Sequence, residues 1–453
     1  MSESGPSTRE KAAFVAGLAV LAFLFGSAVQ IKGCFPGPQL EQAWHQADQL
    51  TRNPRPHFLV PKTFDREGVR APQPDRVQPG LNLVSAVWKG EKRWRPGLRL
   101  IDNDGELVHE WRVDAREIFD DPSVADRVNK DLKYSNPGEF YLFPERGDVL
   151  LNFGYVGLAR LDACGEVVWS LPALSHHSVH RADDGTFWVP ASSSERHVEI
   201  PGHEERMPGF KGKKEAKGVY LDRLVNVSPD GEVLREINVL DVLYRNGLDR
   251  HVVKSYQARI QDNEPPPEDI THVNDVEPLD GDMAEAYPLF ERGDLMVSVR
   301  NLDLVIVFDP ETKKVKWHVS EPLIQQHDPD FLGDGRIAVF DNNRDGTDRG
   351  TRLGGSRIVA IEPATGKTDV LFPTEESEQF YTKVGGRWQM LENGNLLMAE
   401  TKTGRLLEVD SSGRSVWEWV HPAYDGMVSE VTRVTRHDLT GREVADWKCG
   451  SDS

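Results

Sequence analysis

Short runs of alternating apolar and polar residues dominate the chain from about Leu81 onward. In one recurring phrase, an alternating run leads to an acidic or serine residue, a turn that usually ends in glycine, and a second alternating run. A period of two is typical of a β-strand with one buried face, and the glycine supplies the positive φ that short hairpin loops require. Each copy therefore predicts a β-hairpin. The copies lie at residues 97–113, 157–171, 223–239, 304–319, 357–372 and 405–420.

A second phrase, in which a strand-like run follows a glycine, alternates with these hairpins. Its copies lie at residues 143–154, 181–191, 290–300, 331–341 and 390–400, with a weaker one around 82–87. The two phrases give about four strands per unit in six units, a pattern typical of β-propellers. A β-sandwich with a coincidental repeat is the alternative, and six copies argue against it. We predict an all-β, six-bladed β-propeller over residues 81–447, closed by its first and last strands in one blade and followed by a tail at 448–453.

The third unit carries the longest insertion, residues 239–271. The segments LDVLYRNG and HVVKSYQARIQ within it have helical patterns. Long loops in compact domains are usually functional. We therefore expect the insertion to form a lid, or a surface for a protein partner or a second copy of the chain.

Residues 12–31 form an uncharged stretch, with Arg9 and Lys11 before it and Lys32 after it. As a helix, a stretch of this length reaches about 30 Å, which is the thickness of the bilayer core. We predict a transmembrane anchor that follows a short tail, residues 1–11, and keeps the N-terminus inside the cell. A cleaved signal peptide is the alternative, although its apolar stretch is usually shorter. Both alternatives export the rest of the chain.

Residues 32–80 are rich in proline, which suppresses helix and favours extended chain. Only residues 39–50 have a helical pattern. We predict a spacer arm between the membrane and the propeller. An arm that binds a protein partner or another copy of the chain is the alternative.

The charge and the cysteine count exclude some classes of protein. The formal net charge of −19 argues against a nucleic-acid partner, which would need a basic surface. An anionic substrate would therefore need a local cluster of positive groups.

With only three cysteines, no disulfide framework holds the fold. One bridge, between Cys34 and Cys449 where the ring would close, and three free thiols remain open alternatives.

Three histidines occupy matching places in the second phrase. His177 and His327 each lie eight residues before the glycine of their copy, and His272 lies nine before it in the stretched third unit. Equivalent positions in successive blades face the same level of the central channel, so we expect the three imidazoles to converge. Arg300 ends a strand in the same unit as His272, and Asn274 faces the same side of its strand. A lone histidine is more often structural, but three in register with an arginine favour a site.

Other kinds of site fit the sequence less well. The segment His176–His180 suggests a metal site, but there are no cysteine pairs or HExxH-type spacings, and an arginine nearby would repel a cation. We therefore predict no metal. The segment from Asp341 to Asp345 copies half of a calcium loop but has Arg352 where the loop needs glutamate, so we expect a solvated acidic turn. With no phosphate-binding or dinucleotide fingerprint, we predict no cofactor.

Transfer of a tetrahedral anion is the chemistry that these residues fit. A neutral imidazole nitrogen can attack the sulfur of a sulfate ester and form a covalent sulfohistidine, from which the group passes to an alcohol or a phenol. An arginine and further imidazoles would hold the sulfuryl oxygens in a channel that excludes bulk water.

Five motifs between residues 176 and 343, HHSVHRADDG, DITHVNDV, VSVRN, QQHDPDFL and VFDNN, resemble those of the arylsulfotransferase family. Members are exported bacterial six-bladed propellers that move a sulfuryl group from one phenolic sulfate to another phenol without a nucleotide sulfate donor. The resemblance extends over about residues 81–445. It implies a propeller on the periplasmic side of the cell inner membrane, with an aryl sulfate and a phenol as its small-molecule partners.

The resemblance also implies residue roles. It makes His327 the nucleophile that becomes sulfated. It makes His272, Asn274, Arg300 and His177 the residues that bind and polarise the sulfuryl oxygens. The same motifs place three further residues in the substrate-binding site: His176, Asp341 and Asn342.

The sequence departs from the family pattern in three places. Ser178 stands where the family commonly has aspartate, the third unit is stretched between its two motifs, and residues 35–80 are too few for the amino-terminal β-sandwich of some members. The alternative function is therefore a non-catalytic, membrane-anchored propeller that acts as a binding or scaffold module in an exported complex.

Overall fold

The computed structural model of the protein describes residues 58–90, 94–130, 137–193, 221–262 and 269–448, together with Gly17 and Pro267. The segments expected to form the N-terminal tail, the transmembrane anchor and most of the arm lie outside these residues, apart from Gly17. Within the described part of the chain, no helix is both long and apolar enough to cross a membrane.

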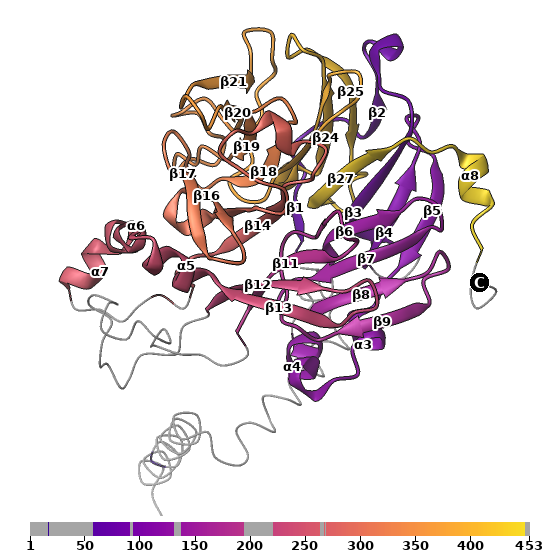
Figure 1. The fold of residues 1–453 in the computed structure, drawn as a ribbon. Helices are drawn as coiled ribbons and strands as arrows, with labels where there is room; N and C mark the ends of the chain where they lie inside the picture. Colours follow the sequence, from indigo (N-terminus) through magenta and orange to yellow (C-terminus); the bar gives the residue numbers. More distant parts are fainter. Residues whose placement is uncertain are drawn as a thin grey trace, which may run out of the picture. The chain divides into compact units, whose positions relative to one another are not determined.

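Six antiparallel sheets surround a common axis as the blades of a propeller (Figure 1). The first three, each named from its innermost strand outward, are β27 (Val431–His437), β3 (Leu81–Lys89), β4 (Trp94–Ile101) and β5 (Leu107–Arg112); β6 (Pro137–Phe143), β7 (Asp148–Phe153), β8 (Gly157–Leu161) and β9 (Val167–Leu171); and β10 (His180–Arg181), β11 (Phe187–Ser192), β12 (Asp222–Val227) and β13 (Val233–Asn238). The fourth and fifth are β14 (Val273–Pro278), β15 (Leu295–Val299), β16 (Leu304–Asp309) and β17 (Lys314–Val319); and β18 (His327–Phe331), β19 (Ile337–Asp341), β20 (Arg357–Ile361) and β21 (Thr368–Phe372). The sixth has five strands: β22 (Arg387–Met390), β23 (Leu396–Glu400), β24 (Arg405–Val409), β25 (Ser415–Val420) and β2 (Gly68–Arg70).

The ring is closed by the last described strand and by the strand that begins at Leu81. The C-terminal strand β27 pairs with β3 in the first blade, with Val434 opposite Val84. The prediction of six blades, with the first and last strands in one blade, is confirmed.

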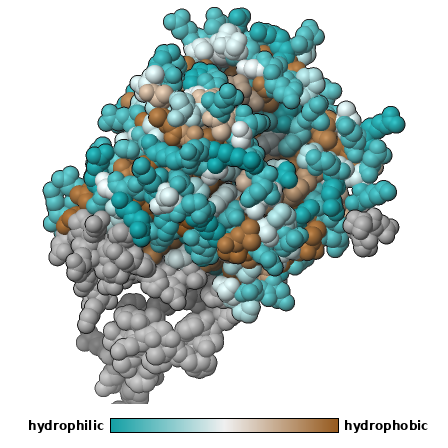
Figure 2. Space-filling view, viewed as in Figure 1, coloured by the Kyte–Doolittle hydropathy of each residue, from teal (hydrophilic) through white to brown (hydrophobic). Residues whose placement is uncertain are grey.

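Neighbouring blades stack face to face, and this explains the hydrophobic pattern. Every residue of the middle strand β7 is buried, whereas the outermost strand β9 is exposed or half-buried along its length. Strands covered on both faces read as continuous apolar runs, and strands at the rim alternate. The surface seen in Figure 2 is mostly hydrophilic, with apolar residues in small groups.

Part of the expected spacer arm belongs to the propeller. β2 extends the sixth blade beside β25, and β1 (Leu59–Pro61) pairs with β26 (Met427–Ser429). Between and after these strands, Arg66 donates to Glu418 at 2.9 Å and Arg76 pairs with Asp410. Of the predicted spacer arm, residues 32–80, the described part from residue 58 onward therefore packs on the propeller through β1 and β2.

The expected helices of the insertion are present and lie beside the third and fourth blades. They are α5 (Val239–Arg245), α6 (Asp249–Ser255) and α7 (Gln257–Gln261). The side chain of Asn238 caps α5 by accepting from the backbone N–H of Asp241 at 3.1 Å. Nearly all of α5 is buried against the core that these two blades share, so the first part of the insertion is an integral part of the fold.

The remaining helices among the described residues are short. They are α3 (Ala115–Ile118), α4 (Pro122–Lys130), α8 (Gly441–Ala445) and the 3₁₀ turns η1 (Pro74–Arg76), η3 (Ala284–Ala286), η4 (Arg300–Leu302) and η5 (Thr401–Thr403). In the turn between β8 and β9, Cys164 is disulfide-bonded, and its partner lies outside the described residues. The expected Cys34–Cys449 bridge falls on residues outside the described part of the chain.

Candidate active site

β-bulges mark one end of the central channel. In four blades the pairing of the innermost strand with its neighbour shifts register near the strand's first residues. The extra residue in each case is Gly138, Asn274, Asp328 or Thr432. A bulge re-aims the side chains around it. The predicted site residues of blades four and five, Asn274 and His327, lie at these irregular strand ends.

The three predicted histidines converge at this end of the channel. The ring centroids of His177 and His272 lie 4.9 Å apart in an edge-to-face arrangement. Burial holds the pKa of His177 well below its usual value, and the nearby positive charges that His272, His176, His327 and Arg387 can carry lower it further. The structure therefore brings together side chains from three successive blades, as the repeat predicts.

The histidines do not reach the axis in the same way. His327 is the residue just before the bulge in its strand, whereas His272 lies two residues before the bulge in its own. His272 and His177 both have left-handed backbone, with φ of 48° and 57°. Such values are uncommon for residues other than glycine and cluster at functional sites. His272 and His327 thus differ by one residue in their distance from the bulge, so their positions in the repeat are not strictly equivalent.

One neighbour determines which nitrogen of His327 is free. His327 Nδ1 lies 2.6 Å from Asn342 Oδ1. The amide nitrogen of Asn342 donates to the carbonyl oxygens of Thr382 at 2.9 Å and Gly385 at 2.7 Å, so its oxygen must face the imidazole. By this hydrogen-bonding pattern Nδ1 carries the proton and donates it, which leaves the lone pair on Nε2. Asn342 therefore positions the candidate nucleophile, in place of the predicted contact with substrate.

The surroundings of His327 also keep it neutral. Its side chain is buried, and this lowers its pKa because the channel disfavours an imidazolium. The positive charges of Arg300 and Arg387 lower the pKa further, although the hydrogen bond to Asn342 acts in the opposite direction. The pKa lies well below the ordinary value of 6.5, so His327 is a neutral base at neutral pH.

Arg300 offers an unpaired positive charge beside the histidines. Among the described residues its guanidinium donates only to neutral amides, those of Asn301 at 3.1 Å and Gln325 at 3.2 Å, and forms no ion pair. Its Nε–H is buried and has no partner in the same part of the chain. Gln325 also accepts from Arg344 at 2.9 Å, so two arginines lie together. A buried, unsatisfied donor on a cation indicates a place for an anion.

His176 supports His177 rather than facing a substrate. The two Nδ1 atoms lie 2.8 Å apart, and Nε2 of His176 lies 3.4 Å from the carboxylate of Asp222. Asp222 is itself fixed, because it accepts from Thr271 Oγ1 at 2.6 Å. The ring of Tyr155 covers His176 with 4.7 Å between centroids. His176 is almost fully buried, so its predicted role in substrate binding becomes one of positioning.

The other predicted binding residues, Asn274 and Asp341, differ in whether their side chains still have an atom free to contact a substrate. Asn274 donates to the carbonyl of Gln326 at 2.8 Å and keeps its buried side-chain oxygen without a partner among the described residues. Asp341 is fully engaged, since it accepts from the backbone N–H groups of Ile324 and Asn343 and pairs with Arg357 at 2.8 Å. Asp341 is therefore structural. The acidic turn after it is buried rather than solvated, which corrects the expectation from the calcium-like pattern.

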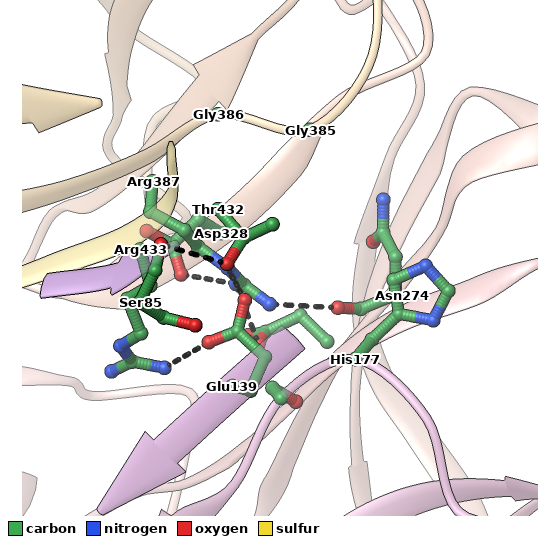
Figure 3. A network of polar contacts seen from close by, with 12 residues as sticks. Ser85, Glu139, His177, Asn274, Asp328, Gly385, Gly386, Arg387, Thr432 and Arg433 are labelled. Carbon is green, nitrogen blue, oxygen red and sulfur yellow. Dashed lines mark hydrogen bonds and ion pairs between the residues drawn. The ribbon is translucent and has the colours of Figure 1, made fainter. Parts of the chain in front are cut away.

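A buried arginine that the sequence pattern did not predict, Arg387, lies in a polar network beside Asn274 (Figure 3). Arg387 donates to Glu139 at 2.8 Å, to Asp275 at 3.2 Å and to the carbonyl of Asn274 at 3.3 Å, and it pairs with Asp328. These carboxylates hold its pKa well above the usual value in spite of burial, so it stays charged.

Arg387 fixes the chain next to the candidate nucleophile, because Asp328 directly follows His327. The backbone N–H of Trp388 donates to the same carboxylate at 2.8 Å. The repeat contained a hint of this arginine. At the aligned position where three units have a histidine, this unit has Gly386, the residue just before Arg387. A side chain at Gly386 would collide with the Phe340 ring, 2.3 Å from the position of a Cβ, so this blade contributes its next residue instead.

Metal binding has no support in the described part of the chain, where no group of three or more His, Cys, Asp or Glu side chains could hold an ion. The arrangement defines a six-bladed propeller with a neutral histidine, His327, and an arginine without an ion pair among the described residues, Arg300, at one end of its channel. The family model described as "Arylsulfotransferase (ASST)" matches residues 137–422, more than half of the chain. The protein belongs to the arylsulfotransferase family.

Other comparisons give weaker similarities. A structure of a protein of unknown function from Bacteroides caccae has 13% identity and a TM-score of 0.46, covering 79% of this chain and 98% of its own. TolB from Acinetobacter baumannii has 12% identity and a TM-score of 0.40, covering 78% and 65%. Virginiamycin B lyase from Staphylococcus aureus has 12% identity and a TM-score of 0.33, covering 63% and 70%. No curated protein matches the sequence. These similarities are too weak to inform function.

Proposed function

We propose that the protein moves a sulfuryl group from a phenolic sulfate ester to a phenol or an alcohol, through a sulfohistidine at His327 and without a nucleotide donor. The observation that carries this proposal is the pairing of His327 with Asn342, which leaves Nε2 unprotonated beside the unpaired guanidinium of Arg300. Membership in the arylsulfotransferase family supports the same class of reaction.

In the first half of the reaction, Nε2 of His327 attacks the sulfur of the donor. The N–S bond forms as the bond between sulfur and the phenolic oxygen breaks, and the phenolate leaves with the electron pair. Arg300 faces the sulfuryl oxygens, where its charge stabilises the transition state in a channel shielded from water. The expected product is a sulfohistidine in which Asn342 still accepts the Nδ1 proton.

In the second half, the oxygen of an acceptor phenol or alcohol attacks the same sulfur. The new O–S bond forms as the N–S bond breaks, and the electron pair returns to Nε2 of His327. The acceptor loses its proton in this step, so a base must lie near its oxygen. The donor and acceptor occupy one site in turn, which gives ping-pong kinetics.

A turnover assay tests this proposal. The protein without residues 1–31 is mixed with 4-nitrophenyl sulfate and phenol, and release of 4-nitrophenolate is followed. His327→Ala should abolish release because the covalent step is lost. His318→Ala, which removes an exposed histidine of β17, is the matched control and should keep full activity. Activity retained by His327→Ala would refute the mechanism, and an inactive wild type would favour the scaffold alternative.

We also propose that residues 12–31 anchor the propeller on the periplasmic side of the inner membrane, because the stretch is uncharged and long enough to span. The full chain should then stay with membranes through a high-salt wash, and a chain without this segment should not. A mature N-terminus near residue 30 would contradict the anchor.

A further inference from the structure

The insertion in the third unit ends in a residue that contacts the active site directly. Both carboxylate oxygens of Asp269 contact His272. Oδ1 accepts from the backbone N–H of His272 at 3.0 Å, and Oδ2 lies 2.5 Å from its Nδ1. Burial would raise the pKa of Asp269, but the hydrogen bond and charge of His272 outweigh this effect and lower it. Asp269 is therefore a carboxylate that binds the Nδ1 proton of His272.

The segment that carries Asp269 is held in place from two sides. Tyr256, between α6 and α7 of the insertion, donates its hydroxyl to the carbonyl of Ile270 at 2.7 Å. From the fourth blade, the side chain of Asn301 donates to the carbonyl of Asp269 at 3.2 Å. The backbone N–H of Arg300 donates to the carbonyl of His272 at 3.2 Å. The insertion, His272 and the turn of Arg300 thus form one connected unit.

His272 differs from His177 in the partner of its Nδ1 atom. His272 faces a carboxylate, whereas His177 faces the imidazole of His176. A carboxylate on Nδ1 fixes the tautomer with the lone pair on Nε2, and it stabilises the imidazolium that forms when Nε2 takes a proton. His272 is therefore better suited to gain and lose a proton at Nε2, next to His177 and His327.

We infer that Asp269, and through it the insertion, positions His272 as the group that carries the phenolic proton. This inference rests on the proposed sulfuryl transfer. In the first half, His272 in its imidazolium form gives the Nε2 proton to the leaving phenolate oxygen as the bond between sulfur and oxygen breaks. In the second half, neutral His272 takes the proton of the acceptor as its oxygen attacks sulfur and the N–S bond breaks. One proton is given and one is taken, so the cycle is balanced.

Asp269→Asn tests this role because an amide offers only one acceptor where the carboxylate offers two. Single-turnover sulfation of His327 without an acceptor is compared on 4-nitrophenyl sulfate, whose leaving group needs no proton, and on phenyl sulfate, whose leaving group does. Loss of positioned acid–base catalysis costs about 10²–10⁴-fold. We expect a loss of this order on phenyl sulfate and a loss below about tenfold on 4-nitrophenyl sulfate. Asp262→Asn, an exposed aspartate in the same insertion, is the matched control and should match the wild type on both donors.

A second measurement separates positioning from a general structural role. In a His272→Gln background the group that Asp269 acts through is absent, so adding Asp269→Asn should change phenyl sulfate transfer less than twofold. Equal losses on the two donors, or additive losses in the double variant, would overturn the inference. Both outcomes leave the proposed function intact provided that His327 of the wild type is sulfated. An Asp269→Asn protein that fails to fold is replaced by Asp269→Glu, which keeps the carboxylate and should retain more phenyl sulfate activity than Asp269→Ala.

Discussion

At the scale of single residues, the site combines a buried neutral base, His327, with a half-buried arginine, Arg300, that forms no ion pair among the described residues. A histidine in water would be partly protonated near neutral pH, and a protonated nitrogen cannot attack sulfur. Burial and two neighbouring arginines make the protonated form of His327 unfavourable, and Asn342 directs the remaining proton to Nδ1. The candidate nucleophile is thus neutral, with the lone pair on Nε2, in the structure without a substrate.

This environment predicts an unusual pH dependence. An unperturbed imidazole is half protonated at about pH 6.5. Because the pKa of His327 is lowered, the free base stays populated as the pH falls through that value, and it is lost only at more acid pH. Sulfation of His327 by 4-nitrophenyl sulfate in single-turnover experiments should therefore change little between pH 8 and about pH 6. A rate that halves near pH 6.5 would show that His327 titrates normally.

A second prediction concerns the effect of replacing Arg300 on turnover. Removing one preorganised donor to developing charge costs about 10²–10³-fold in turnover. We expect a loss of this size for Arg300→Ala, with an unchanged melting midpoint because the guanidinium forms no ion pair among the described residues. Arg349→Ala removes an exposed arginine and serves as the control. An Arg300→Ala protein with near wild-type turnover would mean that the sulfuryl oxygens bind elsewhere.

At the scale of elements, the hairpin phrases predict the blades, but the strand ends at the channel do not follow from them. Alternation and turn glycines are local signals, so the outer strands are readable from the sequence. The bulges at Asn274 and Asp328 add one residue to a strand without changing its composition, so the alternating pattern does not reveal them. Arg387 was missed for a related reason, since it lies one residue beyond the aligned position.

The N-terminal strands were missed because their partners lie far away in the sequence. β1 and β2 have three residues each and pair with strands more than 300 residues later. No local pattern reveals such a pairing, and nearby prolines suggest an extended linker. The same limit applies to Asp269, whose role depends on a contact between an insertion and a channel residue.

The N-terminal strands yield a stability prediction. A chain of residues 81–453 loses β2 from the edge of the sixth blade, together with the arginines that pair with the buried Glu418 and Asp410. Leaving a buried acceptor unsatisfied costs about 1–3 kcal/mol. Thermal unfolding of this chain should therefore begin several degrees below that of residues 56–453. Equal melting midpoints for the two chains would mean that β1 and β2 do not stabilise the propeller and serve only as a spacer.

At the scale of the whole molecule, an acidic protein holds an arginine without an ion pair among the described residues, Arg300, at one end of its central channel. The net charge of −19 argues against polyanionic partners, whereas Arg300 and Arg344 lie together at one end of the ring. Closure of the ring by β27 and β3 brings Glu139, Asp275 and Asp328, from three blades, around Arg387 of a fourth. The site exists only when all the blades are in place.

Mass spectrometry of the covalent intermediate tests the central claim most directly. The protein is mixed briefly with 4-nitrophenyl sulfate without an acceptor, then quenched at alkaline pH and digested. We predict one sulfuryl group, on His327, that is lost when phenol is added before the quench. The adduct should be absent from His327→Ala and present in His318→Ala. A sulfuryl group on another residue, or transfer to phenol by a wild type that never carries one, would contradict the account.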